Sequence, residues 1–126
     1  MEYSMDREKK LLEIIKVAQD ELRGIQLEKR IKENKESLGK CYKEYVDNGS
    51  SLITYTCVES IDIWGNLHGR VFDVGGHNEW VTIYEGDREL RDASYLSKYS
   101  VELTREEFET TYAVVLSILS LSLNNK

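Results

Sequence analysis

The stretch CYKEYVDNGSSLITYTCV, residues 41–58, decides the fold of this chain. Tyr, Thr, Val and Ile are enriched on both sides of a polar segment that contains Gly49, which is typical of two strands joined by a loop. If Gly49 marks the centre of that loop, Cys41 lies opposite Cys57 and Tyr45 lies opposite Ile53. The sequence therefore predicts an antiparallel hairpin over residues 41–58.

The same pattern continues after the hairpin and predicts a four-stranded meander. The second hairpin strand is expected to continue over residues 59–64, and two further strands are expected over residues 67–74 and 79–84, with turns at Gly65-Asn66 and at residues 75–78. The register across Gly65 stays open at this point. A two-residue loop places Ile61 opposite Arg70, and one additional loop residue places it opposite Val71, which suits burial better.

The segment after the meander is less regular. Residues 85–100 contain a turn signal at Gly86-Asp87 and three hydrophobic anchors, Tyr95, Leu96 and Tyr99, in a polar background. We interpret this segment as a functional or connecting loop. Val101–Leu103 is then expected to add a short fifth strand.

A long helix is predicted before the sheet, over residues 6–38. Its apolar residues recur in steps of four, three, four and three, the spacing of a coiled-coil seam: Leu11, Ile15, Ala18, Leu22 and Ile25. A second stripe takes over towards the C-terminal end: Gly24, Leu27, Ile31, Asn34 and Leu38. A helix of about 30 residues is about 45 Å long, too long for a small domain to cover. We expect it to pack against a copy of itself; the alternative is that it folds back on its own sheet around Gly24.

A second helix is predicted at the C-terminal end. Thr104 and Glu107 have the spacing of a capping box, in which each side chain bonds to the other residue's backbone N–H. The residues Phe108, Tyr112, Val115 and Leu119 then recur on one face, and the helix is expected to end near Leu121. The fold class is thus α+β: a long N-terminal helix, a small antiparallel sheet of four to five strands, with an SH3-like barrel as one possible closure, and a C-terminal helix.

Length and charge limit the classes of function. With 126 residues and 14.6 kDa, the chain is expected to hold an N-terminal oligomerisation helix, residues 1–39, and one sheet domain with its helix, residues 40–126. No apolar run approaches the length of about 20 residues that a membrane span requires, so a cytoplasmic protein is expected. The net charge is −6, and residues 41–126 carry seven Lys and Arg against fourteen Asp and Glu. This acidity disfavours direct binding to duplex nucleic acid.

Metal binding and catalysis lack a recognisable motif. Two cysteines, Cys41 and Cys57, and two histidines, His68 and His77, show no paired ligand spacing, so no metal and no cofactor are expected. The hairpin register brings the two cysteines together, and we expect free thiols in the core, with a disulfide as the alternative. No nucleophile and base are visible as a pair, so no catalytic residue is named and an enzyme is not expected.

Arginines and aromatic residues in the sheet domain are the more informative set. Planar guanidinium forks match phosphate, and aromatic rings stack on bases, which together are what binding of a small nucleotide requires. Arg105 also lies in the first turn of the last helix, where free N–H groups favour an anion. The candidate ligand-binding residues are Arg105, Arg70, Phe72, Arg88, Arg91 and Trp80. The alternative is that Phe72 and one tryptophan are core residues and that the arginines form surface ion pairs with nearby carboxylates.

Two short segments, LGKCYK at residues 38–43 and LTREEFE at residues 103–109, and the layout around them resemble small accessory proteins of phages and prophages. The layout is similar to that of the Thoeris anti-defence sponges. This resemblance implies a homo-oligomer in the host cytoplasm that sequesters a cyclic ADP-ribose-type immune signal through arginines and an aromatic residue, carried over here to Arg105, Arg70 and Phe72. The alternatives are an anti-CRISPR or other inhibitor that binds a host defence protein through its acidic surface, and a structural phage accessory protein.

Overall fold

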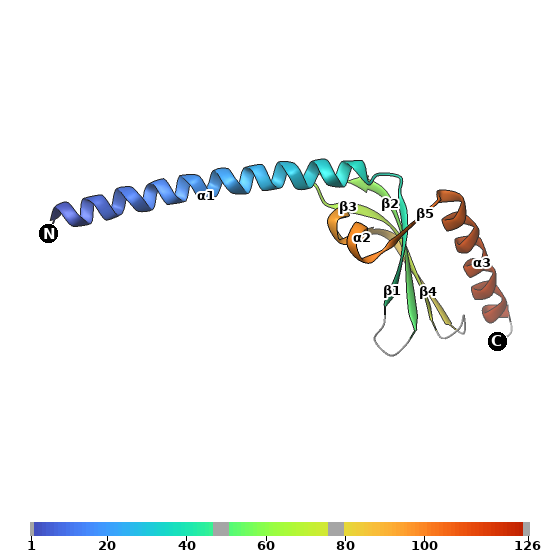
Figure 1. The fold of residues 1–126 in the computed structure, drawn as a ribbon. Helices are drawn as coiled ribbons and strands as arrows, with labels where there is room; N and C mark the ends of the chain where they lie inside the picture. The colour runs from blue at the N-terminus through green and yellow to red at the C-terminus, as the bar shows by residue number, and fades with distance from the viewer. Residues whose placement is uncertain (1, 47–50, 76–79, 125–126) are drawn as a thin grey trace. The chain divides into compact units, whose positions relative to one another are not determined.

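The structure, a computed structural model, describes residues 2–46, 51–75 and 80–124 (Figure 1). The elements in chain order are α1 (Glu2–Glu36), β1 (Cys41–Val46), β2 (Leu52–Ile61), β3 (Leu67–Gly75), β4 (Trp80–Glu89), α2 (Ala93–Tyr99), β5 (Val101–Leu103) and α3 (Arg105–Asn124). The chain divides into two compact units, residues 1–32 and residues 33–126. The predicted turns around Gly49 and His77 lie outside the described residues.

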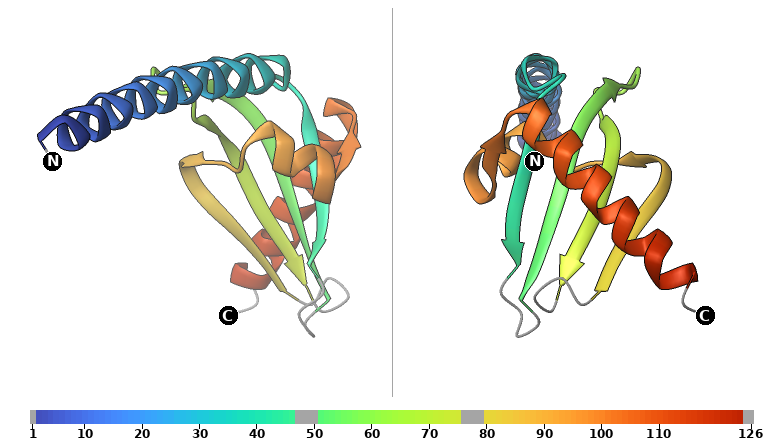
Figure 2. Two further views of the ribbon diagram at one scale, coloured as in Figure 1. Left: turned by 60° about the vertical axis from the view of Figure 1, so that its left-hand side comes forward. Right: turned by 90° about the vertical axis from the view of Figure 1, so that its right-hand side faces the viewer.

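The five strands form one antiparallel sheet in the order β4-β3-β2-β1-β5. This confirms the α+β class and the short fifth strand that the sequence predicts. In the described part of the chain, β4 and β5 are the opposite edges of an open sheet, so the sheet does not close into an SH3-like barrel. Figure 2 shows the strands side by side as an open, twisted layer.

The hairpin register predicted from residues 41–58 is confirmed. Cys41 lies opposite Cys57, and Tyr45 lies opposite Ile53. The two thiols are free and fully buried, with their sulfur atoms 3.1 Å apart. Burial, reinforced by the neighbouring Cys57 thiol, raises the pKa of Cys41 to about 12.

Each face of the sheet has its own core, because successive strand residues point to opposite sides. On one face, α3 packs Phe108 and Val115 against Cys41, Cys57 and Phe72. On the other face, α2 packs Leu96 against a second cluster formed by Tyr42, Val58 and Leu67. The two helices accordingly lie on opposite sides of the sheet (Figure 2).

The connection between β2 and β3 differs from both predicted registers. Strand β2 ends at Ile61, which lies opposite Leu67, and Trp64 belongs to the turn rather than to a strand. The Asp62 carboxylate accepts hydrogen bonds from the backbone N–H groups of Trp64 and Asn66, at 2.9 Å each. Gly65 has a φ of +85°, which glycine adopts readily. Asp62 thus closes a longer loop than the two or three residues that the sequence suggested.

Residues 85–100 are more regular than expected. Strand β4 continues to Glu89, and a helix, α2, follows it. Gly86, with a φ of +80°, forms part of a bulge within β4 instead of a turn between elements. The prediction of a loop over this segment was wrong.

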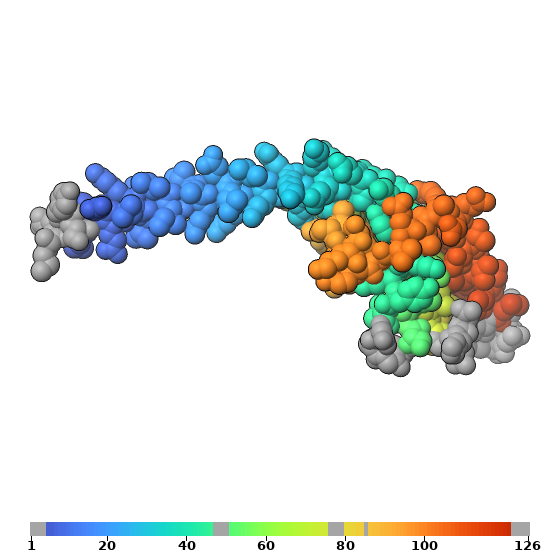
Figure 3. All heavy atoms as spheres, viewed as in Figure 1, coloured from blue at the N-terminus to red at the C-terminus, as the bar shows by residue number. Residues whose placement is uncertain are grey.

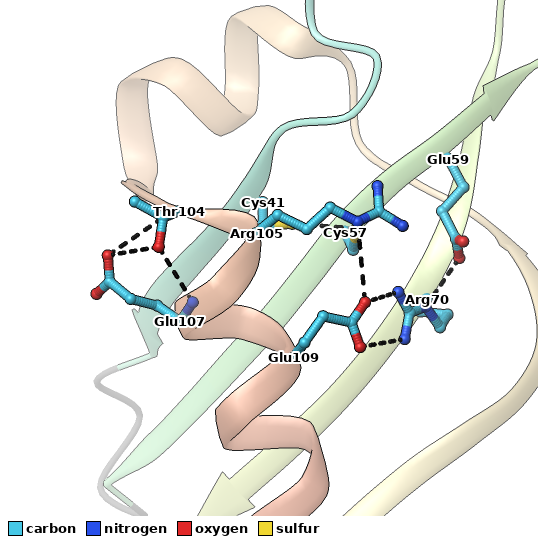
Figure 4. Close-up of polar contacts among 8 residues, drawn as sticks. All are labelled: Cys41, Cys57, Glu59, Arg70, Thr104, Arg105, Glu107 and Glu109. Atoms are coloured by element: carbon cyan, nitrogen blue, oxygen red, sulfur yellow. Dashed lines mark hydrogen bonds and ion pairs between the residues drawn. The ribbon is translucent and has the colours of Figure 1, made fainter.

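The two long helices follow the sequence signals. In α3, the Glu107 N–H donates to Thr104 Oγ1 at 3.1 Å, and the Thr104 N–H donates to Glu107 Oε1 at 3.3 Å, which confirms the capping box (Figure 4). Phe108 and Val115 are buried on the predicted face. Helix α1 is continuous through Gly24. No helix in the described part of the chain has the length and apolar character needed to cross a bilayer.

Candidate functional site

Two β-bulges lie on either side of Arg70. On the β2 side, Val58 pairs with Gly69 and Ser60 pairs with His68, so Glu59 is an additional residue. On the β4 side, Gly69 pairs with Arg88 and Val71 pairs with Tyr84, so residues 85–87 are opposite Arg70 alone. Bulges redirect side chains and increase twist locally. The two bulges thus position the Arg70 side chain so that it extends towards α3.

Gly69 is required for this arrangement. A Cβ atom built on Gly69 would lie 1.8 Å from the Cys57 carbonyl oxygen, well inside van der Waals contact. Only glycine therefore allows β3 to approach β2 at the bulge. The sequence shows the glycine but not the reason for it.

Arg70 forms ion pairs with two carboxylates, one from a strand and one from a helix. Its Nε donates to Glu59 Oε1 at 3.1 Å, and its two terminal nitrogens donate to both oxygens of Glu109 on α3 (Figure 4). The hydrogen bonds from Arg70 hold the pKa of Glu109 below its usual value, and those with Glu109 raise the pKa of Arg70. The guanidinium also lies over the Phe108 and Tyr112 rings, at 5.2 and 5.3 Å from their centroids.

Arg105 points to the same carboxylate. Its Nε lies 3.9 Å from Glu109 Oε1, one helical turn along α3, and its side chain extends over the sheet towards Arg70 (Figure 4). Its side chain is 53% exposed. The structure therefore brings together two of the candidate residues, Arg70 and Arg105, around a carboxylate, Glu109, that sequence reasoning missed. The one available signal was the i, i+4 spacing of Arg105 and Glu109.

A groove runs beside Arg70, between α3 and the β4 edge of the sheet. Its volume is about 600 Å³, and we call it the Arg70 groove. It is lined by Glu59, Arg70, Ile83, Tyr84, Gly86, Asp87, Tyr112, Leu116 and Leu119. One end is charged and the wall from α3 is aromatic and apolar. A concave site of this size, with few polar groups, is typical of small-molecule binding.

Phe72 does not have the predicted role of a stacking surface. Its side chain is fully buried and lies between Tyr55, Phe108 and Tyr112, with its centroid 4.7 Å from that of Tyr55. It is a core residue, as the alternative interpretation held. Trp80 is partly exposed at the start of β4, where its ring covers Gly75 so closely that a Cβ there would lie 2.2 Å from it.

Arg88 and Arg91 do not join Arg70 and Arg105 at Glu109. Arg88 lies over the Tyr84 ring at 4.2 Å, and Tyr84 donates to Asp73 at 2.6 Å. Arg91 lies over the Tyr95 ring at 4.8 Å, and Tyr95 packs against the core on the α2 side of the sheet. The site therefore combines Arg70 and Arg105 and leaves Arg91 on the other face.

A second polar cluster, built on His68, was assigned no role from the sequence. His68 Nε2 lies 2.8 Å from Asp62 Oδ2, and Nδ1 lies 3.2 Å from Asp87 Oδ2. The hydrogen bond with Asp62 raises the pKa of His68, and the same bond lowers the pKa of Asp62 to about 2. Together with the Asp62 bonds to Trp64 and Asn66, this cluster ties the β2–β3 turn to β4.

Comparisons with family models, with curated proteins and with solved structures find no match to this chain. Among the described residues, no group of three or more His, Cys, Asp and Glu side chains is arranged to hold a metal ion.

Proposed function

We propose that the chain is a non-enzymatic binding protein that holds a small phosphate-bearing nucleotide, of the cyclic ADP-ribose type, in the Arg70 groove. The observation that carries this proposal is the convergence of two guanidinium groups, those of Arg70 and Arg105, on the single carboxylate of Glu109 beside the groove. Two guanidinium groups from different elements suit phosphate recognition, because each planar fork can donate two hydrogen bonds to phosphate oxygens.

Glu109 occupies the position where a ligand phosphate would bind. The Arg70 side chain is 27% exposed, so its charge needs a partner in every state of the protein. The Glu109 side chain is 43% exposed and can turn to solvent when a phosphate replaces it. When the phosphate replaces the Glu109 carboxylate, the Arg70 guanidinium still has hydrogen-bond acceptors, and no packing contact of the hydrophobic core has to be broken.

The rest of the groove suits the other parts of a nucleotide. Tyr112 lines the groove next to Arg70, and Leu116 and Ile83 supply apolar surface on the two walls. Aromatic and apolar walls hold a base by stacking and burial, whereas the charged end orients the phosphate. The groove volume of about 600 Å³ lies in the range of small-ligand sites.

Isothermal titration calorimetry tests the proposal with cyclic ADP-ribose isomers and cyclic dinucleotides as probes. The wild-type chain is expected to give saturable heat at micromolar protein, and Arg105→Ala to lose it while keeping its fold, since Arg105 is exposed. Arg91→Ala is the matched control and should bind like the wild type, because Arg91 lies over Tyr95 on the α2 face. Glu109→Gln should bind more tightly, because the competing charge is gone. Absence of heat with every probe would remove the proposal.

A second candidate function is inhibition of a host protein, and the β2–β3 turn favours it. Trp64 is 68% exposed and its neighbour Ile63 is 87% exposed, on a turn whose backbone is held by Asp62. Exposed tryptophans on rigid loops are common anchors of protein interfaces. A salt-sensitive complex with a basic partner that Trp64→Ala abolishes, and Arg105→Ala does not, would favour this candidate over nucleotide binding.

A further inference from the structure

The N-terminal half of α1 carries large apolar side chains that nothing in the described chain covers. Between residues 11 and 18 only Glu13 and Lys16 are polar. The five largest apolar side chains there are between 51% and 65% exposed: Leu11, Leu12, Ile14, Ile15 and Val17. Figure 3 shows the side chains of this blue segment uncovered on the side that faces the viewer. Leaving this much apolar surface in water is unfavourable, and exposed apolar patches of this kind are typical of interaction sites.

The apolar residues cover a wide arc of the helix. Leu11, Ile15, Ala18, Leu22 and Ile25 form the seam at heptad spacing. Leu12 extends the arc on one side of the seam, and Ile14 and Val17 extend it on the other, which leaves only Glu13 and Lys16 on the remaining face of this segment. A two-stranded coiled coil buries the seam alone. A helix that is apolar over most of its circumference is buried by several neighbours.

The apolar seam has defined ends. The next seam positions are Glu8 before Leu11 and Lys29 after Ile25, and both carry charges. The apolar seam therefore runs from Leu11 to Ile25, about 21 Å at 1.5 Å per residue. A seam this short gives a two-stranded coil little stability, and the flanking residues supply apolar area only when further helices contact them.

The charge of the segment favours a copy of the same helix as the partner. Residues 1–40 carry ten Lys and Arg against nine Asp and Glu, so identical helices approach without net repulsion. The mixed signs differ from the basic polar face of helices that lie on anionic membranes. We infer that α1 assembles more than two copies of this chain into a helical bundle, with contacts from Leu11 to Ile25 and with Leu12, Ile14 and Val17 buried against the additional copies.

Sedimentation velocity and equilibrium of the full chain test this inference. The wild-type weight-average mass should exceed twice the chain mass of 14.6 kDa. Ile15→Glu in the seam and Ile14→Lys at the flank should both give mainly monomers, because the short seam alone does not hold two helices together. Leu27→Glu is the matched control, because Leu27 is similarly exposed but lies on the side of the helix away from the seam. The weight-average mass of this variant should equal that of the wild type.

Several outcomes would overturn the inference. The first is a wild type that is monomeric or dimeric at 100 μM protein, on the order of ten or more times the concentration at which a stable bundle dissociates. The second is a Leu27→Glu variant whose mass falls as far as that of Ile15→Glu. The third is a monomer that gains helix only on anionic lipid vesicles. Residues 5–29 are exposed in the single chain, so substitutions there should leave the sheet unit folded. An unchanged thermal unfolding temperature of the sheet unit checks this for each variant. Nucleotide titration of the Ile15→Glu monomer keeps this test separate from that of the Arg70 groove.

Discussion

Arg70 on β3 and Glu109 on α3 form a bidentate ion pair that joins the sheet to the helix packed on it. The pair lies at the edge of the core formed by Phe72, Phe108 and Val115. Because Glu59 binds the remaining edge of the same guanidinium, the ion pair is part of a three-residue network from β2, β3 and α3. This network attaches α3 to the sheet, and in the proposed function it holds Arg70 in place for an anionic ligand.

Glu109→Ala is expected to lower the free energy of unfolding by about 1–2 kcal/mol, because a partly exposed Arg70 loses its two-pronged partner. Chemical denaturation followed by circular dichroism measures the change. Glu106→Ala, an exposed position of the same helical turn, is the control and should change the unfolding free energy by less than about 0.5 kcal/mol. Equal effects of the two substitutions would show that the ion pair contributes nothing specific.

Part of this site follows from the sequence and part does not. Arg70 and Arg105 are identifiable as scarce arginines in an acidic domain, but their meeting point depends on two bulges. No turn signal marks the bulge at Glu59, and the signal at Gly86-Asp87 predicted a turn between elements instead of a bulge. Phe72 was misassigned because an aromatic residue in a strand has the same appearance whether it faces the core or a ligand. Which face is covered depends on where α3 packs, and that is a tertiary property.

Asn34 is expected to be a strong determinant of stability. It is buried, donates to the Gly65 carbonyl at 2.8 Å, and accepts from the Ala93 N–H at 2.9 Å, so it links the end of α1 to the β2–β3 turn and to the start of α2. Asn34→Ala leaves the buried Gly65 carbonyl and the partly buried Ala93 N–H without this partner and should cost about 1–3 kcal/mol. Urea denaturation measures the loss, with the exposed neighbour in Lys35→Ala as the control. An unchanged midpoint in Asn34→Ala would contradict this assignment.

The His68 cluster predicts how stability depends on pH. The folded-state pKa of His68 is raised above 6.5, so its contribution is complete below pH 6.5 and is lost as the pH rises through the raised value. The pKa of Asp62 is lowered from 3.8 to about 2, so its contribution is present above pH 3.8 and is lost as the pH falls towards 2. The difference in unfolding free energy between the wild type and His68→Gln should therefore be largest between pH 3.8 and 6.5.

Thermal unfolding of both proteins across this pH range measures that difference. The groups that face His68 are Asp62 from the turn and Asp87 and Glu89 from β4, all acidic, so each favours the protonated ring. Asp62→Asn is the second variant and should remove most of the same pH dependence. A difference that grows above pH 7 would contradict the assignment of a protonated His68.

The two cysteines are expected to be unreactive in the folded protein. Cys41 and Cys57 are fully buried, and burial raises the pKa of Cys41 to about 12, so very little of that thiol is in the reactive thiolate form at pH 8. Labelling with a thiol-reactive disulfide reagent should be slow in buffer and should reach both thiols in concentrated urea. Rapid labelling of the native chain would contradict the burial of this pair.

Features of the fold that a few neighbouring residues determine were predicted correctly, and features that depend on other contacts were not. The register of Cys41 and Cys57 followed from one hairpin loop, and the capping box of α3 followed from four residues. The Ile61 register failed because the Asp62 side chain closes a larger loop, which alternation of residues cannot indicate. Helix α2 was missed because a seven-residue helix has too few turns to show a period.

The most direct test of nucleotide binding is a proton–nitrogen spectrum of the arginine side chains, recorded while cyclic ADP-ribose is added. We expect the Nε–H signals of Arg70 and Arg105 to move together with one dissociation constant, and that of Arg91 to remain in place. If Arg70 and Arg105 do not move at saturating nucleotide, or if Arg91 moves first, the Arg70 groove is not the binding site.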